Sequence, residues 1–330
     1  MSLVLTGAEV LQLLDMDLAL AAAEEAFQAY GQGRVNMPPK SYLKLTKGDF
    51  RAMYGALVLR HGEICGLKWV NVHPENPEQG LPTVMAKILL NNPDNALEMA
   101  DMDGTHITNF RTGAAGGLAA RYLARPEAAS LGVVGAGVQA RHQVAALLKV
   151  LPIQKIVIYD LIPIRARILR DEISSQYGIR TIVSETPEAA VRDQDVVVTA
   201  TPSTSPIVQR DWVRAGTHIN AIGADAAGKQ EIDGAVLQDA KIIVDDWAQA
   251  QHSGEINVPL AQGRLRPDQV FGCLGDVVTG KKPGRENAWE ITVFDSTGLI
   301  IQDLALGLAV YQRARELNLG EDKDFLPVQC

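Results

Sequence analysis

The sequence predicts an α/β chain of two domains, an α+β domain followed by a doubly wound domain. The chain has 330 residues, which exceeds the usual size of a single hydrophobic core. Its first third shows helical patterns followed by short alternating apolar runs, as in an antiparallel sheet. From residue 130 onward, short apolar strands alternate with helical stretches, which is typical of a parallel sheet flanked by helices.

The first domain is expected to begin with helices. Thr6 and Glu9 have the spacing of a capping box, and a second helical pattern covers residues 15–30 before Gly31. Five strands are then predicted, at residues 41–45, 50–59, 63–72, 81–91 and 96–101. A small-residue helix follows over residues 109–124.

The second domain is predicted from a change in the hydrophobic pattern, in which short apolar strands begin to alternate with helical stretches. Strands are expected at residues 130–134, 155–159, 181–184, 195–200, 218–222 and 242–245. Helices are expected at residues 138–149, 163–177 and 187–192. A last helical pattern, residues 297–317, comes after this strand series, and we expect it to fold back on the first domain.

A glycine-rich turn lies between the first strand and the first helix of this second domain. Gly135 permits a tight turn, Gly137 lets a pyrophosphate approach the backbone, and Ala140 allows helix and strand to pack closely. The following helix would direct free N–H groups and its positive dipole end at the phosphates. Because a strand precedes the turn and a helix follows it, we interpret the unit as a dinucleotide-binding (Rossmann) fingerprint.

Asp160 bears on the choice of cofactor. It ends the second strand, 160 − 137 = 23 positions after Gly137, where a ribose-binding carboxylate is expected. A carboxylate accepts hydrogen bonds from a ribose 2′-hydroxyl and repels a 2′-phosphate, so NAD is favoured over NADP. Two later stretches also fall at carboxyl ends of strands. Residues 199–202, with Thr201, would flank the adenosine ribose, and residues 221–225, with Ile222, Gly223, Ala224 and Asp225, would flank the nicotinamide.

Cations in the first domain indicate the kind of substrate. Arg51 and Lys68 lie inside apolar strand patterns, Lys40 precedes them, and Arg111 opens the small-residue helix. Any one of these side chains could simply point to solvent. Several of them in an acidic chain of net charge −8 suggest an anion pocket, and a substrate carboxylate would fit it.

Charge, hydropathy and cysteine content argue against nucleic-acid binding, a membrane span and a metal site. The acidic balance disfavours nucleic acid as a partner. The apolar stretch at residues 18–29 carries Glu24 and Glu25 and is too short for a membrane span, so we expect a cytoplasmic protein that binds no membrane. Cys65, Cys273 and the terminal thiol Cys330 are widely separated, so no metal site is expected.

These segments together resemble the ornithine cyclodeaminase/μ-crystallin family over nearly the whole chain. The matching segments are MPPK (37–40), GLKWVNVHP (66–74), GLPT (80–83), RTGAAG (111–116), GAGVQ (135–139), GADAAGKQE (223–231), SGEIN (253–257) and FDSTG (294–298). The resemblance implies a dimer formed through the sheet of the first domain. It also implies that residues 1–113 and 297–330 form a substrate-binding and dimerisation domain, into which an NAD-binding domain of residues 114–296 is inserted.

Within the family the chain is most similar to archaeal-type alanine dehydrogenases. Arg51 stands where ornithine cyclodeaminases usually carry an acidic residue, and it would repel a distal ammonium. The resemblance implies Lys68 and Asp225 as catalytic residues, without deciding which is the base, and Lys40, Arg51 and Arg111 as carboxylate ligands. It further assigns Arg111, Thr112, Val138, Gln139, Lys229 and Ser296 to the cofactor site.

The implied reaction is reversible NAD-dependent deamination of L-alanine to pyruvate and ammonia. Two enzymatic alternatives share the scaffold: cyclodeamination of ornithine to proline, and reduction of a cyclic imine such as Δ1-pyrroline-2-carboxylate. A binding protein of the μ-crystallin type is a further alternative, and the presence of both Lys68 and Asp225 disfavours it.

Overall fold

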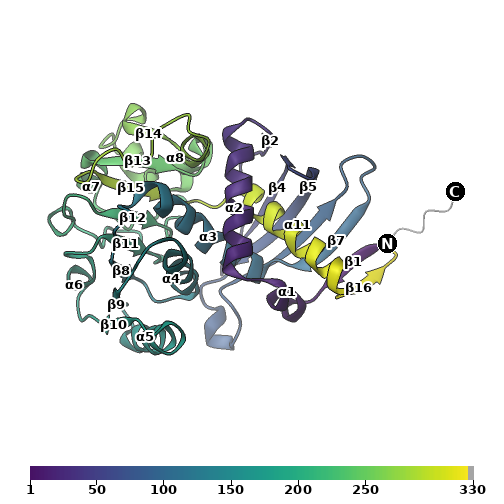
Figure 1. Cartoon of the computed structure of the whole chain (residues 1–330), viewed down its shortest axis with the longest axis horizontal. Coiled ribbons are helices and arrows are strands. Elements are labelled where there is room, and N and C mark those ends of the chain that lie inside the picture. Colours follow the sequence, from purple (N-terminus) through teal and green to yellow (C-terminus); the bar gives the residue numbers. More distant parts are fainter. Residues whose placement is uncertain (326–330) are drawn as a thin grey trace. The chain divides into compact units, whose positions relative to one another are not determined.

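The computed structural model describes residues 1–325 and divides the chain into two compact units. Unit 1 consists of Met1–Arg111 and the segment that begins at Leu299, and unit 2 consists of Thr112–Gly298. Each unit is built around one eight-stranded sheet (Figure 1). The chain therefore leaves unit 1, forms unit 2 and returns. Cys330 lies outside the described residues.

The sheet of unit 1 is mostly antiparallel. Its strands are β1 (Ser2–Leu5), β2 (Val35–Asn36), β3 (Ser41–Lys44), β4 (Asp49–Leu59), β5 (Gly62–Val72), β6 (Val84–Asn91), β7 (Glu98–Asp103) and β16 (Glu321–Lys323). They run in the order β16-β1-β7-β6-β5-β4-β2, with β3 paired to β4, and the β1–β7 pair is parallel. β1 was not predicted, because four residues at the start of a chain carry little periodic signal.

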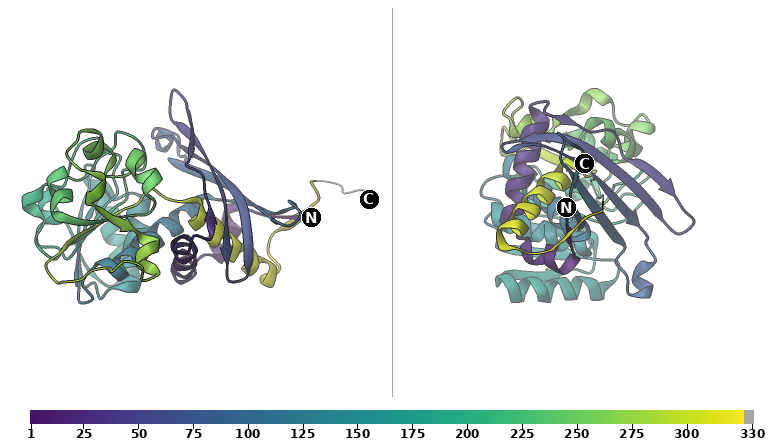
Figure 2. Two further views of the ribbon diagram at one scale, coloured as in Figure 1. Left: turned by 90° about the horizontal axis from the view of Figure 1, so that it is seen from above. Right: turned by 90° about the vertical axis from the view of Figure 1, so that its right-hand side faces the viewer.

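Two long helices cover one face of this sheet. They are α2 (Met16–Gly31) and α11 (Ile300–Leu317), which pack against each other and against β4 (Figure 2). The predicted capping box of Thr6 and Glu9 is confirmed at the start of α1 (Gly7–Leu13). A short 3-10 turn, Asn76–Gln79, precedes β6.

A pair of glycines lets α11 approach the sheet closely. Gly55 on β4 and Gly66 on β5 are direct partners in the antiparallel register. A Cβ atom on Gly66 would lie 2.8 Å from Cδ2 of Leu304, and one on Gly55 would lie 3.1 Å from Cγ2 of Ile300. Side chains at these two positions would therefore push α11 away from the strands.

The sheet of unit 2 is parallel throughout. Its strands are β8 (Ser130–Val134), β9 (Lys155–Tyr159), β10 (Arg180–Val183), β11 (Val196–Thr199), β12 (His218–Ala221), β13 (Ala240–Val244), β14 (Val270–Cys273) and β15 (Ile291–Asp295). Their order is β10-β9-β8-β11-β12-β15-β13-β14. The order reverses between β8 and β11, so this point is the topological switch of a doubly wound sheet, as predicted.

Helices close both faces of this parallel sheet. They are α3 (Thr105–Leu123, which begins in unit 1), α4 (Val138–Val150), α5 (Pro163–Tyr177), α6 (Pro187–Val191), α7 (Gly234–Asp239), α8 (Trp247–Ser253), α9 (Asn257–Ala261) and α10 (Leu274–Val278), with 3-10 turns at Arg210–Trp212 and Pro267–Gln269. Successive residues of one strand, such as Val133 and Val134, point to opposite faces and belong to two separate hydrophobic clusters. Both faces are thus buried, which explains the continuous apolar runs in the sequence.

Two predicted features needed correction. The predicted strand series of unit 2 ended at residue 245, but β14 and β15 follow it, and β15 lies between β12 and β13 in the sheet. The last helix begins at Ile300 rather than at residue 297, since the backbone N–H groups of Thr297 and Gly298 donate to Asp245 at 2.7 Å instead of entering the helix. In the part of the chain that the structure describes, no helix is both long and apolar enough to cross a membrane.

Candidate active site

A buried ion pair joins the sheet of unit 1 to its C-terminal helix. Nζ of Lys68, on β5, donates to Oδ2 of Asp303, on α11, at 2.6 Å. The side chains of Lys68 and Asp303 are 1% and 0% exposed. Lys68 follows Gly66 on the same face of β5, so the close approach of α11 described above brings the carboxylate within reach.

This environment changes the acidity of the lysine. Burial lowers the pKa of Lys68 to about 7, and the positive charges of Arg111 and Lys40 act in the same direction. Asp303 opposes the shift through its charge and its hydrogen bond. An amine that titrates near neutral pH can both accept and donate a proton under working conditions.

Asp303 also holds Arg111. Nε of Arg111 donates to Oδ1 of Asp303 at 3.2 Å, and Nη1 of Arg111 donates to Oε1 of Gln302 at 3.0 Å. One buried carboxylate therefore serves two cations and fixes the distance between them. Sequence analysis missed both Gln302 and Asp303, although two adjacent polar residues in an otherwise apolar helical run were an available signal.

Arg51 extends the cationic surface along the sheet. It lies on β4 diagonally across from Lys68, because Arg51 faces Val70 and Lys68 faces Met53 in the register. Its Nε donates to Oδ1 of Asp49 at 2.8 Å, and its guanidinium lies 5.3 Å from the ring centre of Tyr42. Arg51 is 5% exposed, so it is not a solvated strand residue.

The predicted substrate ligands thus belong to one region of unit 1. Arg51, Lys68 and Arg111 are buried, while Lys40 is half-buried and close enough to influence Lys68 electrostatically. Because the single carboxylate of Asp303 is shared by two cations, a bound anion would offset the remaining positive charge. A planar carboxylate suits the paired N–H groups of an arginine.

The predicted cofactor residues of unit 2 lie along the carboxyl edge of its parallel sheet. Gly135, Gly137, Val138 and Gln139 follow β8, Asp160 follows β9, Thr201 follows β11, Ile222, Gly223, Ala224 and Lys229 follow β12, and Ser296 follows β15. Thr112, on α3, is joined to this unit through its carbonyl, which accepts from Nε2 of Gln143 at 2.8 Å. Ligands of doubly wound folds bind at this edge.

The glycine-rich turn has the shape that a pyrophosphate requires. Gly135 adopts φ +93°, and a Cβ atom there would lie 2.6 Å from the carbonyl oxygen of Ala200. Gly137 is the N-cap of α4, where no side chain caps the helix. A Cβ atom on Gly137 would meet nothing within 4 Å, so open space lies before the free N–H groups of the helix.

Asp160 is held beside this turn. Its Oδ2 accepts from the backbone N–H of Ala136 at 2.7 Å, and its Oδ1 accepts from that of Ile162 at 2.8 Å. Each oxygen retains a lone pair for a further donor such as a ribose hydroxyl. Arg165 is exposed and lies in the first turn of α5.

Ser296 offers a buried hydroxyl at the same edge. It is 3% exposed, and its Oγ has no hydrogen-bond partner among residues 1–325. Its backbone N–H donates to Ala221 at 3.0 Å, which places it beside the loop after β12. A buried hydroxyl without a partner is costly, so a ligand group that bonded to it would stabilise the site.

Two of the predicted cofactor positions lie on opposite sides of the glycine-rich turn. Residues 199–202, which were expected to flank the adenosine ribose, follow β11, and β11 and β9 lie on opposite sides of β8. Asp160, the ribose-binding candidate, follows β9. The loop after β11 therefore lies with the loop after β12, on the side away from Asp160.

Asp225 forms an ion pair of its own within unit 2. Its Oδ1 lies 2.5 Å from Nζ of Lys229, one helical turn later in sequence, and both side chains are partly exposed. Its backbone N–H donates to the carbonyl of Gly223 at 3.0 Å. Asp225 thus sits on the loop after β12, at the ligand edge of the sheet.

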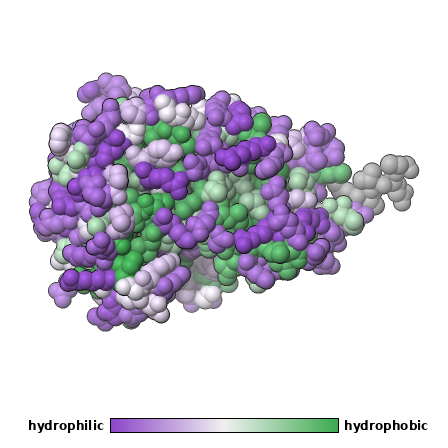
Figure 3. All heavy atoms as spheres, in the orientation of Figure 1, coloured by the Kyte–Doolittle hydropathy of each residue, from purple (hydrophilic) through white to green (hydrophobic). Residues whose placement is uncertain are grey.

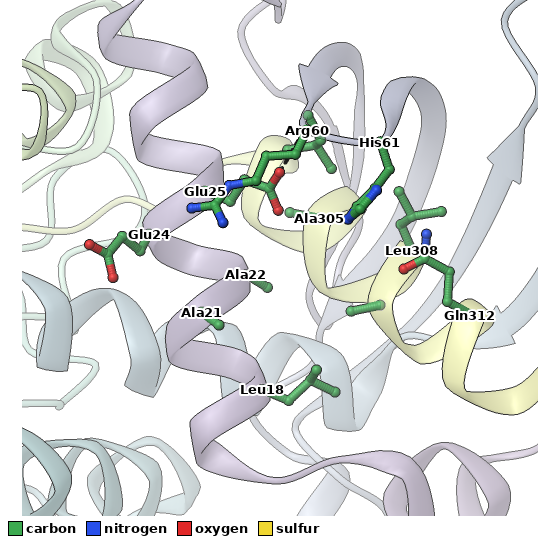
Figure 4. A pocket seen from close by; sticks show the side chains of 12 residues that line it. Leu18, Ala21, Ala22, Glu24, Glu25, Arg60, His61, Ala305, Leu308 and Gln312 are labelled. Atoms are coloured by element: carbon green, nitrogen blue, oxygen red, sulfur yellow. Dashed lines mark hydrogen bonds between the residues drawn. The ribbon is translucent and has the colours of Figure 1, made fainter. Parts of the chain in front are cut away.

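A cavity of about 260 Å³ elsewhere in unit 1 contains none of the predicted residues. It lies between α2, α11 and the turn that joins β4 to β5 (Figure 4). Ala21, Ala22, Ala305 and Ala309 contribute small side chains to its lining, and hydrophobic atoms reach the surface over these helices in Figure 3. We do not associate it with the chemistry of Lys68.

The chain matches known proteins along almost its whole length. The family model of the ornithine cyclodeaminase/mu-crystallin family matches residues 1–318. The chain is 47% identical over 329 residues to an alanine dehydrogenase of Archaeoglobus fulgidus, covering 99% of each protein.

Two solved structures are similar along the whole chain. One is an archaeal alanine dehydrogenase dimer with bound NAD, with a TM-score of 0.94 and 48% identity over 98% of this chain and 99% of that one. The other is a Thermococcus litoralis Δ1-pyrroline-2-carboxylate reductase in complex with NADH and L-proline, with a TM-score of 0.94 and 34% identity over 97% and 100%. The chain belongs to the ornithine cyclodeaminase/mu-crystallin family.

Proposed function

We propose that the chain is an NAD-dependent alanine dehydrogenase, which converts L-alanine, NAD⁺ and water to pyruvate, ammonium, NADH and a proton. The observation that carries the proposal is the buried cluster of Arg51, Lys68 and Arg111, in which Lys68 and Arg111 share Asp303. Such a cluster favours a substrate carboxylate. The 47% identity to the Archaeoglobus fulgidus alanine dehydrogenase supports the same reading.

Arg51 favours alanine over a diamino acid. Its buried guanidinium would repel a distal ammonium, and its neighbour Asp49 is already neutralised by it at 2.8 Å. In the proposed site, Arg51 and Arg111 hold the carboxylate, with Lys40 at the margin. Fixing the carboxylate orients the Cα–H bond of the substrate. This raises the rate because less entropy is lost between the bound substrate and the transition state.

Lys68 is proposed as the acid/base group. With a pKa of about 7, its neutral amine can remove a proton from the substrate ammonium, which frees the nitrogen lone pair to form the iminium as hydride leaves Cα. Once that proton has been released to solvent, the neutral amine can take a proton from the water that adds to the iminium and pass it to the nitrogen of the resulting carbinolamine. It can then accept the hydroxyl proton as ammonia departs and the carbonyl of pyruvate forms. Asp225, paired with Lys229, is assigned to stabilising positive charge on the substrate nitrogen.

The residues of unit 2 are proposed to hold NAD. The turn of Gly135 and Gly137 and the N-terminus of α4 would bind the pyrophosphate. Asp160 would bind the adenosine ribose. Ser296 and the loops after β11 and β12 would bind the rest of the cofactor. When bound, NAD⁺ supplies the hydride acceptor. Arg111, Thr112, Val138, Gln139 and Lys229 are proposed cofactor contacts because the family resemblance implies them.

A cyclic imino acid is a second candidate substrate. The TM-score to the pyrroline-2-carboxylate reductase equals that to the alanine dehydrogenase, and an imino acid presents the same carboxylate to Arg51 and Arg111. The two activities differ in whether ammonia is released, so they can be separated by product.

A substrate panel tests the proposed reaction. Incubation with NAD⁺ and L-alanine is expected to give equal amounts of NADH and ammonia, whereas L-ornithine should give neither proline nor ammonia. NADH with Δ1-pyrroline-2-carboxylate serves as the comparison for imine reduction. Ammonia and proline from ornithine without NADH, or turnover restricted to the cyclic imine, would contradict the proposal.

Asp160→Asn tests the cofactor preference. Loss of the charge should weaken NAD binding and relieve repulsion of the 2′-phosphate, so the ratio of Kd for NADP to Kd for NAD should fall roughly tenfold or more. Arg165→Ala is the matched control and should leave the ratio unchanged, since this side chain is exposed. An unchanged ratio in Asp160→Asn would remove Asp160 from the cofactor site.

We also propose a homodimer formed through the uncovered face of the unit 1 sheet. Tyr54 and Trp69 are 47% and 40% exposed on that face, and Trp69 stacks on Phe50 with ring centres 5.0 Å apart. An exposed apolar sheet face of this kind is typical of an interface. The archaeal alanine dehydrogenase with a TM-score of 0.94 is described as a dimer.

Light scattering on the purified protein tests the dimer. The wild type is expected at twice the chain mass of 35.6 kDa, and Trp69→Glu should shift it toward the single-chain mass. Trp289→Glu is the control, because Trp289 is 73% exposed in unit 2 and should not affect association. A monomeric wild type, or a dimeric Trp69→Glu, would exclude this interface.

A further inference from the structure

Three fully buried carboxylates form a row in unit 2 that the proposed chemistry does not use. They are Glu231, Glu255 and Asp295, each no more than 1% exposed. Within residues 1–325, none of them forms an ion pair with a lysine, arginine or histidine. Buried carboxylates without a cation are rare, because desolvation of the charge must be offset by hydrogen bonds.

Asp295 and Glu255 each accept hydrogen bonds from two consecutive backbone N–H groups of the next segment. Asp295, at the end of β15, accepts from the backbone of Glu255 at 2.9 Å and of Ile256 at 3.2 Å. Glu255 in turn accepts from the backbone of Glu231 at 2.9 Å and of Ile232 at 2.6 Å. The carboxylate of Asp295 thus fixes the segment that carries Glu255, which fixes the segment that carries Glu231.

The row ends on the two loops at the ligand edge of the sheet. Glu231 accepts from the backbone N–H of Thr201 at 2.6 Å and from that of Gly223 at 2.7 Å. It also accepts from Oγ1 of Thr199 at 2.8 Å. One side chain therefore ties the loop after β11 to the loop after β12.

Glycines make this arrangement possible. A Cβ atom on Gly223 would lie 2.6 Å from Cδ of Glu231, and one on Gly254 would lie 2.7 Å from Oδ1 of Asp295. Neither glycine is forced by a left-handed backbone, since both have negative φ angles or extended conformations. The carboxylate of Asp295 occupies the space beside Gly254. The space beside Gly223 is occupied by the carboxylate of Glu231 and by the backbone carbonyl of Thr201, whose oxygen a Cβ atom would approach to 2.1 Å.

We propose that Glu231 is a positioning residue that holds the loops after β11 and β12 in the conformation that receives the nicotinamide half of NAD. The inference rests on the proposed binding of NAD. The strand order supports it, because β11 and β12 lie on the side of β8 away from β9 and Asp160. Glu255 and Asp295 hold Glu231 in place and do not reach these loops through the hydrogen bonds described.

The protonation of the row is consistent with this role. Burial, with the charge of Glu231 beside it, raises the pKa of Glu255 well above its usual range. Burial raises the pKa of Asp295 to about 8. Burial also raises the pKa of Glu231, and the hydrogen bonds from Thr201, Thr199 and Gly223 act in the opposite direction.

The test compares NADH with ADP-ribose, which lacks the nicotinamide. In Glu231→Gln an NH₂ group replaces one carboxylate oxygen. Because this group cannot accept a hydrogen bond from a backbone N–H, one of the two loops should lose its hydrogen bond to this side chain. We expect the Kd for NADH, measured by the fluorescence of the bound cofactor, to rise at least tenfold. The Kd for ADP-ribose should change less than twofold. Thr199→Val, which removes one donor without changing shape greatly, should weaken NADH binding to a smaller degree.

Asp195→Asn is the matched control. Asp195 also accepts two consecutive backbone N–H groups, from Ala129 at 2.9 Å and Ser130 at 3.0 Å, but at the amino ends of the strands. It should lower the Tm at least as much as Glu231→Gln and leave both dissociation constants unchanged.

Two outcomes would overturn the inference. One is Glu231→Gln and Thr199→Val both binding NADH as the wild type does. The other is Glu231→Gln weakening NADH and ADP-ribose equally, because a general loss of structure would do this. A wild type that binds neither ligand would instead refute the proposed function on which the inference rests.

Discussion

The contact between Lys68 and Asp303 is the constraint on which the proposed chemistry depends. It links β5 to a helix 235 residues later in the sequence and is closed to solvent. The glycine pair on β4 and β5 brings the helix close enough for a 2.6 Å hydrogen bond. The same carboxylate orients Arg111, so one interaction sets both the acidity of the amine and the position of a carboxylate ligand.

This arrangement is expected to cost stability at lower pH. Burial lowers the pKa of Lys68 from 10.5 to about 7, so the unfolded chain binds more protons than the folded chain between these two values. Folding stability contributed by this site therefore rises with pH across that window and is lowest below about pH 7. A lysine kept here in spite of that cost is more readily explained by function than by stability.

The ligand-binding groups of unit 2 are also held in fixed positions, but by different interactions. Its ligand edge is shaped by backbone amides that are held by buried carboxylates, rather than by cations. Asp160 fixes the glycine-rich turn, and Glu231 fixes the loops after β11 and β12. Fixed backbone dipoles of this kind need no rearrangement when a ligand arrives, which is an advantage for binding and for catalysis.

Local signals in the sequence were sufficient for the doubly wound unit and for the glycine-rich turn. Strand, glycine turn, helix and second strand are contiguous there, and Ser130–Val134 and Lys155–Tyr159 have the predicted bounds. β15 was missed because its position between β12 and β13 depends on long-range pairing. Asp303 and Glu231 were missed for a similar reason: their roles depend on partners that only the fold brings near.

The pKa of the Lys68 amine is the quantity that tests the account most directly. It can be measured by NMR titration of the protein labelled with 13C at lysine Cε, with Lys68→Arg used to assign the signal. The account predicts a value of about 7 in the wild type, and a lower value in Asp303→Asn, because Asp303 raises the pKa that burial lowers. A wild-type pKa near the ordinary 10.5, or a value that Asp303→Asn leaves unchanged, would contradict it.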